Sequence, residues 1–286
     1  MRHLLILLSA PLCVALSSPL LAKQKVSFDA TPLVGYRQDN INWKTKTGST
    51  EKWKNLQGID YGIKTTTTFK DRYKMYIDLG FANFFSGKMT DSNYLAAPGS
   101  GNPTNNSLNG KGFAFRPNIA FGFNMKPLKS LDLIPQLGFV YDRIKLNGKK
   151  TSDNPLTSLT NTLQWYGPYV GLDSKTKFGQ RWTMTASGSI NLSFYNGSGN
   201  WKFTGDQTNN TMKQNGHGYG LMGKLGVQYL VVKTVTLGCE GDIHWNRVAN
   251  NGNDRRNFAN GTSIKSKLKN VNWTSFAGRL TLTKTF

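Results

Sequence analysis

Ionisable residues recur at alternate positions in segments that are otherwise apolar or rich in small residues. If those segments are strands, alternate residues share one face. Charges gathered on one face can pair as a salt-bridge network, or they can line a polar path for small solutes. The residues on this face are Asp60, Lys64, Lys74, Asp78, Arg116, Asp142, Lys224, Glu240, Asp242, His244 and Arg279. The residue types alone leave both alternatives open.

The first 22 residues have the features of a secretory signal peptide. Arg2 precedes an apolar run from Leu4 to Leu16, and the small residue Ala22 precedes Lys23. This run is shorter than the ~20 residues that a transmembrane helix needs. We therefore expect residues 1–22 to be a signal peptide and residues 23–286 to form one exported domain.

Cysteine and histidine limit the chemistry of the mature chain. Cys13 falls within the expected signal peptide, which leaves Cys239, His217 and His244. A single cysteine cannot form an intrachain disulfide. The three residues are also too few for a Cys/His metal cluster, and nucleotide-binding glycine motifs are absent from the sequence. We expect no metal and no cofactor.

Period-two hydrophobicity identifies the elements that must position the charges. In residues 73–85, 113–124 and 182–194, large apolar residues alternate with small or polar ones. Such alternation predicts strands, and these are longer than the ~5–6 residues usual in soluble proteins. Ten strands are predicted, at 26–37, 56–69, 73–85, 113–124, 131–145, 161–176, 181–195, 216–229, 234–246 and 272–286.

The connections between these strands alternate in length. Short turns alternate with long polar segments at 38–55, 86–112, 146–160, 196–215 and 247–271. Aromatic residues cap the apolar stripes, as at Trp182 and Phe194. Short periplasmic turns, long extracellular loops and aromatic girdles are typical of outer-membrane barrels. We predict an all-β fold, a ten-stranded antiparallel transmembrane β-barrel with five long extracellular loops, in the outer membrane of a Gram-negative bacterium.

The end of the sequence fits this prediction. Alternation continues to Phe286, and a closed barrel must pair its last strand with its first. We therefore expect this strand to be held to its end. Phe286 also resembles the C-terminal aromatic residue of outer-membrane proteins, which implies recognition by their assembly machinery.

The chain is strongly basic, with a formal net charge of +21. Export argues against a nucleic-acid partner, although basic proteins often bind one. Many cations lie in the predicted loops, where they can pair with phosphates of lipopolysaccharide, attract other anionic partners, or simply be solvated. The oligomeric state is not predicted.

Three stretches resemble the omptins, ten-stranded outer-membrane proteases. They are FSGKMTDSNYL (residues 85–95), YGPYVGLD (166–173) and CEGDIHWNRV (239–248), which occur in the omptin order. The chain is also similar, with fewer matching residues, to outer-membrane porins of chlamydia-like bacteria. The resemblance implies the same barrel topology.

The resemblance also implies where omptin catalytic residues would lie. Omptins use an Asp pair and an Asp–His pair to activate a water. Here Asp91 occupies the first position but Asn93 replaces the second, and the expected Asp-x-His is Asp206-Gln207-Thr208. Neither Asn nor Thr can act as the required base. His217 or His244 would serve only if the correspondence were shifted.

We therefore expect no catalytic, cofactor-binding or metal-binding residue, and a non-catalytic surface protein or a small-solute pore. The alternatives are an omptin-type protease with a rearranged site and a soluble periplasmic β-sandwich that binds acidic ligands. A ten-stranded barrel leaves little room for a pore, because about eight strands already enclose a lumen that side chains fill.

Overall fold

The protein is described by a computed structural model that covers residues 26–97, 105–128, 130–149 and 155–286. The expected signal peptide and parts of the connections at 86–112 and 146–160 lie outside the described residues. Within them, no helix is long and apolar enough to cross a membrane.

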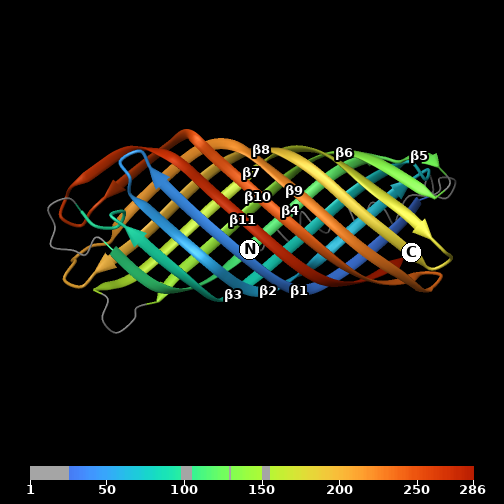
Figure 1. Cartoon of the computed structure of the whole chain (residues 1–286), viewed down its shortest axis with the longest axis horizontal. Helices are drawn as coiled ribbons and strands as arrows, with labels where there is room; N and C mark the ends of the chain where they lie inside the picture. The colour runs from blue at the N-terminus through green and yellow to red at the C-terminus, as the bar shows by residue number, and fades with distance from the viewer. Residues whose placement is uncertain (1–25, 98–104, 129, 150–154) are drawn as a thin grey trace, which may run out of the picture.

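The chain forms one antiparallel barrel (Figure 1). The wall closes where β1 pairs with β11 and β4 pairs with β6. β5 is a four-residue continuation of β4 after Asn124, so the barrel has ten long strands, as predicted. The strands are β1 (Val26–Thr45), β2 (Thr50–Phe69), β3 (Tyr73–Ser92), β4 (Asn105–Phe123), β5 (Met125–Leu128), β6 (Leu131–Lys149), β7 (Leu156–Phe178), β8 (Trp182–Phe203), β9 (Asn210–Val232), β10 (Val235–Asn257) and β11 (Ser263–Thr285).

The first and last strands are joined along most of their length. Their register runs from Asp29 opposite Thr285 to Thr45 opposite Leu268. At the periplasmic end, Phe286 N donates to Phe28 O at 2.8 Å, and the two rings lie 6.0 Å apart. The final strand is therefore held to its end, because in hydrocarbon an unpaired edge would leave backbone amides without partners.

A belt of exposed apolar side chains marks the membrane-spanning part of the wall. Its middle contains residues such as Leu137 and Leu280, which are 62% and 67% exposed. Aromatic residues border the belt at both ends, as alternation predicted. The periplasmic girdle includes Tyr73, Phe123, Phe178 and Trp182, and the extracellular girdle includes Tyr36, Phe85, Phe113, Phe194, Tyr219 and Phe276.

The strands continue well beyond the extracellular girdle, into most of the segments predicted as loops. β1 reaches Thr45 rather than residue 37, and β10 reaches Asn257 rather than residue 246. Beyond the girdle, the inward-facing side chains are mainly apolar and the outward-facing side chains are mainly polar, which is the reverse of the membrane-spanning part. Val34 and Tyr36 face the membrane, whereas Ile41 and Trp43 point inward and are 1% and 0% exposed. Water outside this part of the wall favours an apolar interior and a polar exterior.

Irregularities in the ladders accompany this change. The register between β1 and β2 shifts between Asp39 and Ile41, next to Asn55, which has a φ of 51°. The register between β10 and β11 shifts between Ala249 and Gly252. The bulge at Asn55 shifts β2 by one residue, so the inward positions change there from Trp53 to Leu56. The alternation is unbroken in β1 and β10, where the types of residue change and the faces do not.

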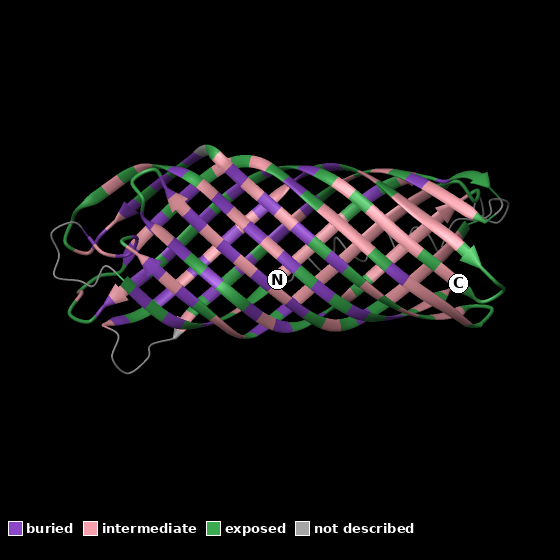
Figure 2. Ribbon diagram, in the orientation of Figure 1, coloured by how far each residue is buried: buried purple, intermediate pink, exposed green. Residues whose placement is uncertain are grey.

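Figure 2 shows the result, with buried residues gathered toward the extracellular end of the barrel. This end contains the main hydrophobic core, so the barrel has a lipid-facing half and a half with a packed interior.

A matched pair of truncations tests this division. Leu163→Ala removes a fully buried side chain from the extracellular half and leaves a cavity, whereas Leu137→Ala removes a lipid-facing side chain whose place lipid can fill. We expect Leu163→Ala to cost about 2–5 kcal/mol, and Leu137→Ala to cost at least about 1 kcal/mol less because the cavity contribution is missing. Urea unfolding of the protein in lipid vesicles measures both. Equal losses would contradict a packed core in this half.

Candidate functional site

A network of ion pairs lies in the membrane-spanning part of the lumen. Arg279 of β11 pairs with Asp60 of β2 at 2.5 Å, with Glu240 of β10 at 3.0 Å and also with Asp242. Lys64 pairs with Glu240 at 2.5 Å. The residues come from strands on both sides of the β1–β11 closure. The predicted inward face is thus confirmed, and most of its charges form ion pairs with one another.

A second part of this network lies on the opposite wall. Arg116 of β4 pairs with Asp142 of β6 at 2.8 Å, and Asp142 lies 4.0 Å from Nδ1 of His244. Nε2 of His244 lies 2.9 Å from Nδ2 of Asn246, and the imidazole packs on Trp273 with ring centroids 4.5 Å apart. His244 is 1% exposed, so it is built into the packed lumen.

Above the network, large side chains fill the barrel from wall to wall. Trp165 lies between Trp273 and Tyr195, with ring centroids 5.1 and 4.9 Å away. We call this cluster the extracellular plug. Its largest members are at most 1% exposed: Trp43, Trp53, Tyr94, Trp165, Tyr195, Trp201, Phe203 and Trp273. Protein interiors of this kind pack about as densely as organic crystals.

The connection after β3 turns inward and completes the plug. Tyr94 follows the strand and is fully buried. Its hydroxyl donates to Asp254 Oδ1 at 2.5 Å and accepts from Gln214 Nε2 at 2.6 Å. Arg256 donates to Tyr94 O at 2.6 Å and lies over its ring, with Cζ 4.4 Å from the centroid. Burial raises the pKa of Tyr94 well above its usual value, so the phenol remains a donor.

Two buried carboxyl groups lie opposite each other in the extracellular half of the barrel, which extends beyond the membrane. Glu51 of β2 and Asp91 of β3 are paired in register and both point inward. Glu51 Oε1 accepts from Trp53 Nε1 at 2.7 Å and from Asn161 Nδ2 at 2.6 Å. Burial raises the pKa of Glu51 well above its usual value, and the charge of Asp91 raises it further.

Asp91 holds the inward-turning connection. Its Oδ1 accepts from the backbone N–H of Tyr94 at 3.0 Å and of Leu95 at 3.3 Å, and its Oδ2 accepts from Asn106 Nδ2 at 3.0 Å. Burial raises the pKa of Asp91 to about 6, although these hydrogen bonds oppose the rise. Both oxygens are engaged within the protein and the side chain is 4% exposed, which makes Asp91 a structural anchor.

The periplasmic half of the lumen encloses a cavity of about 250 Å³. Its walls combine charged groups, such as Lys74 and Asp173, with hydroxyl groups, such as those of Tyr76 and Thr283. Near its inner end it borders the ion pair of Lys64 and Glu240. The cavity therefore lies on the periplasmic side of the charge network, with the extracellular plug beyond it.

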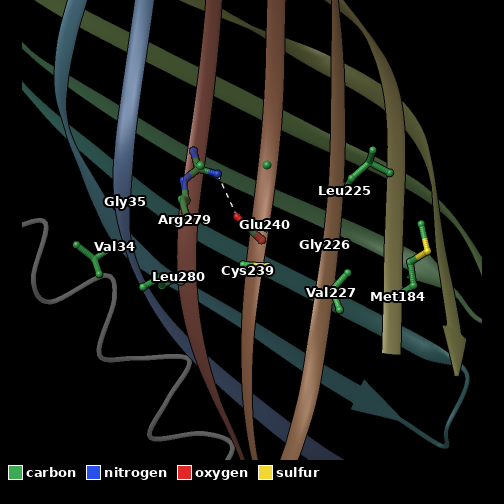
Figure 3. Close-up of a pocket in the computed structure, with 12 residues that line it drawn as sticks. Val34, Gly35, Met184, Leu225, Gly226, Val227, Cys239, Glu240, Arg279 and Leu280 are labelled. Carbon is green, nitrogen blue, oxygen red and sulfur yellow. Dashed lines mark hydrogen bonds and ion pairs between the residues drawn. The ribbon is translucent and has the colours of Figure 1, made fainter. Parts of the chain in front are cut away.

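A second hollow, of about 620 Å³, lies on the outer wall within the apolar belt (Figure 3). It is surrounded by the apolar side chains of Val34, Leu225, Leu280 and Met184. Glycines between them have no side chain, which leaves the space open. It faces the hydrocarbon, while the ion pair of Arg279 and Glu240 belongs to the lumen network behind it.

The structure places the residues of the omptin comparison in separate environments. Asp91 is buried beside Tyr94 of the plug, and Asp206 lies in the β8–β9 turn, where Oδ2 accepts from Asn210 Nδ2 at 2.7 Å. His217 is on the exposed face of β9, and His244 is in the lumen. The wall of the barrel thus separates His217 from His244 and Asp91.

Sequence reasoning did not identify the residues that close the lumen. Tyr94, Gln214, Asp254 and Arg256 come from three segments that were predicted as loops. A signal was present, since Ile41 and Trp43 alternate with Asn40, Asn42 and Lys44 in one such segment.

The model of the Protochlamydia outer membrane protein family matches residues 32–286. The chain belongs to this family. No curated protein matches it in sequence. Membership in the Protochlamydia outer membrane protein family and the barrel fold place the protein in the outer membrane as an integral protein, as the sequence predicted.

One solved structure supports the same fold. The crystal structure of the outer membrane protease OmpT from Escherichia coli superposes with a TM-score of 0.71 at 13% identity, covering 91% of this chain and 97% of that one. The outer membrane protein OprG from Pseudomonas aeruginosa gives a TM-score of 0.42 at 12% identity, covering 91% and 95%. The likeness to OmpT confirms the predicted omptin-like barrel, and at this identity it concerns the fold alone.

The buried carboxyl groups make stability depend on pH. Because the folded-state pKa of Asp91 is raised from 3.8 to about 6, its contribution to stability is fully present below about pH 3.8 and is lost as the pH rises through about 6. The upper limit of this loss is about 3 kcal/mol. Asp91→Asn keeps an acceptor but removes the titration, so its unfolding midpoint should fall less between pH 4 and pH 7.

Urea midpoints at a series of pH values measure this effect. Asp206→Asn, in an exposed turn, is the control for loss of one carboxylate. Identical pH profiles for wild type and Asp91→Asn would show that Asp91 has no such role.

Proposed function

We propose that the protein is a non-catalytic surface protein of the outer membrane whose lumen does not conduct solutes. The observation that carries this proposal is the extracellular plug, in which five tryptophans are at most 1% exposed. Below it, most of the charges at the level of Arg279 and Arg116 form ion pairs with one another. The barrel then acts as a rigid support that displays its outer extramembrane wall to the surroundings.

The proposal includes export of the chain, for which residues 1–22 would be the signal peptide. At the extracellular girdle, Arg143 and Arg247 each lie two residues beyond an aromatic residue, Tyr141 and Trp245. Cations at this level can pair with the phosphates of lipopolysaccharide in the outer leaflet. These pairs would fix the height of the barrel in the membrane.

Planar-bilayer recording distinguishes a non-conducting surface protein from a small-solute pore. We expect the refolded protein to produce no discrete conductance steps at 100 mV, because the plug blocks the lumen. Insertion is established independently, by flotation with vesicles and by heat-modifiable gel mobility. Reproducible steps from protein that passes both controls would favour the small-solute pore.

The omptin-type protease remains the second candidate, favoured by the likeness of the fold to OmpT. The engaged oxygens of Asp91 and the separated histidines support a non-catalytic protein instead. We expect no cleavage of dibasic peptides by the protein in lipopolysaccharide. Cleavage that persists through purification and disappears in the His244→Ala or His217→Ala variant would identify a rearranged site.

A further inference from the structure

Four exposed cations lie together on the outer face of β9, β10 and β11. Lys213 of β9 is directly opposite Arg255 of β10, and Arg255 is directly opposite Lys265 of β11. Lys267 lies two residues further along β11, where its Nζ donates to Asn253 Oδ1 at 2.6 Å. We call Lys213, Arg255, Lys265 and Lys267 the cationic patch.

The fold does not neutralise this patch. None of the four cations forms an ion pair with another described residue. The nearby acid Asp254 points inward, where it is 1% exposed and is bound by Tyr94, Gln214 and Arg256. Like charges directly opposite each other in a sheet are destabilising. The arrangement therefore carries a cost to folding that an anionic ligand would offset.

The patch is too far from the membrane to be a site for lipid phosphates. Arg255 is ten residues beyond Trp245, which lies at the girdle. At about 3.3 Å per residue and a strand tilt of roughly 40°, it lies on the order of 20 Å above the girdle. The polar headgroup layer is only about 5–8 Å thick on each side. The ligand must come from beyond the bilayer surface.

The composition of the patch indicates which polyanion it suits. The exposed large apolar and aromatic residues of these three strands lie at or below the girdle, the highest being Tyr219, Ile243 and Phe276. Single-stranded nucleic acids are bound by stacking bases on such aromatic residues. Three of the four cations are lysines, which act as point charges and do not impose the bidentate geometry of arginine. These features suit an extended polyanion that carries closely spaced groups of single negative charge and has no nucleobases.

We propose that the cationic patch binds a sulfated polysaccharide. The proposal rests on the proposed function only in that this wall faces the surroundings of the cell. It names the partner of the displayed surface, and it does not depend on whether the lumen conducts.

Two variants with the same change in charge test the proposal. The patch variant is Lys213→Gln, Arg255→Gln, Lys265→Gln and Lys267→Gln. The control variant replaces four outward-facing lysines elsewhere on the extramembrane wall, no two of them directly opposite each other: Lys54→Gln, Lys111→Gln, Lys145→Gln and Lys202→Gln. Both sets point outward, so both variants should fold, which heat-modifiable gel mobility checks. Heparin binding to each protein in detergent is measured by surface plasmon resonance at 0.15 M salt.

We expect the patch variant to lose at least about tenfold in affinity for heparin and the control variant to lose less than about threefold. Equal losses would show diffuse attraction by net charge and would overturn a specific site, as would absence of binding by the wild type. An oligo(dT) of equal charge that binds as tightly would assign the patch to nucleic acid. Binding only to lipopolysaccharide vesicles would assign it to lipid phosphates. Conductance steps with intact heparin binding would overturn the proposed function alone.

Discussion

The need to bond every backbone amide within the wall governs this structure. Hydrocarbon offers no partner to an exposed N–H or C=O, so a sheet can cross the membrane only as a closed barrel. The pairing of β1 with β11 supplies that closure, over a register from Asp29–Thr285 to Thr45–Leu268. The order of strands, the short periplasmic turns and the position of Phe286 all follow from this closure.

The same wall continues into water, where the burial rule reverses. In the membrane, Leu137 and Leu280 face outward and Arg279 faces inward; above it, Trp43 faces inward and Lys44 faces outward. The apolar interior gives the extramembrane half a core of its own. A barrel built in this way combines a membrane-spanning part with an extramembrane part that has a packed core.

Much of the fold could be predicted from sequence, because a lipid-facing strand shows its period of two directly, as at Trp182 to Phe194. The alternation along the strands predicted that Arg279 and Asp60 point inward, and their ion pair confirms this prediction. The upper wall was interpreted as loops, since its outward half is polar and the bulge at Asn55 interrupts the alternation. The insertion of Tyr94 could not be predicted, because its partners Asp254 and Gln214 lie over 100 residues away in sequence.

Spin labels along β10 test the central claim that the wall is continuous and that the polarity of its outer and inner faces reverses at the girdle. A Cys239→Ser background would receive single cysteines at positions 243, 248 and 255, and the native Cys239 would serve as a fourth site. The account predicts high oxygen and low nickel-chelate accessibility at 239 and 243, the opposite at 255, and low accessibility to both at 248, because Val248 is fully buried. Nickel-chelate access at 248 would reveal an open, water-filled lumen and would contradict the account, as would oxygen access without nickel-chelate access at 255.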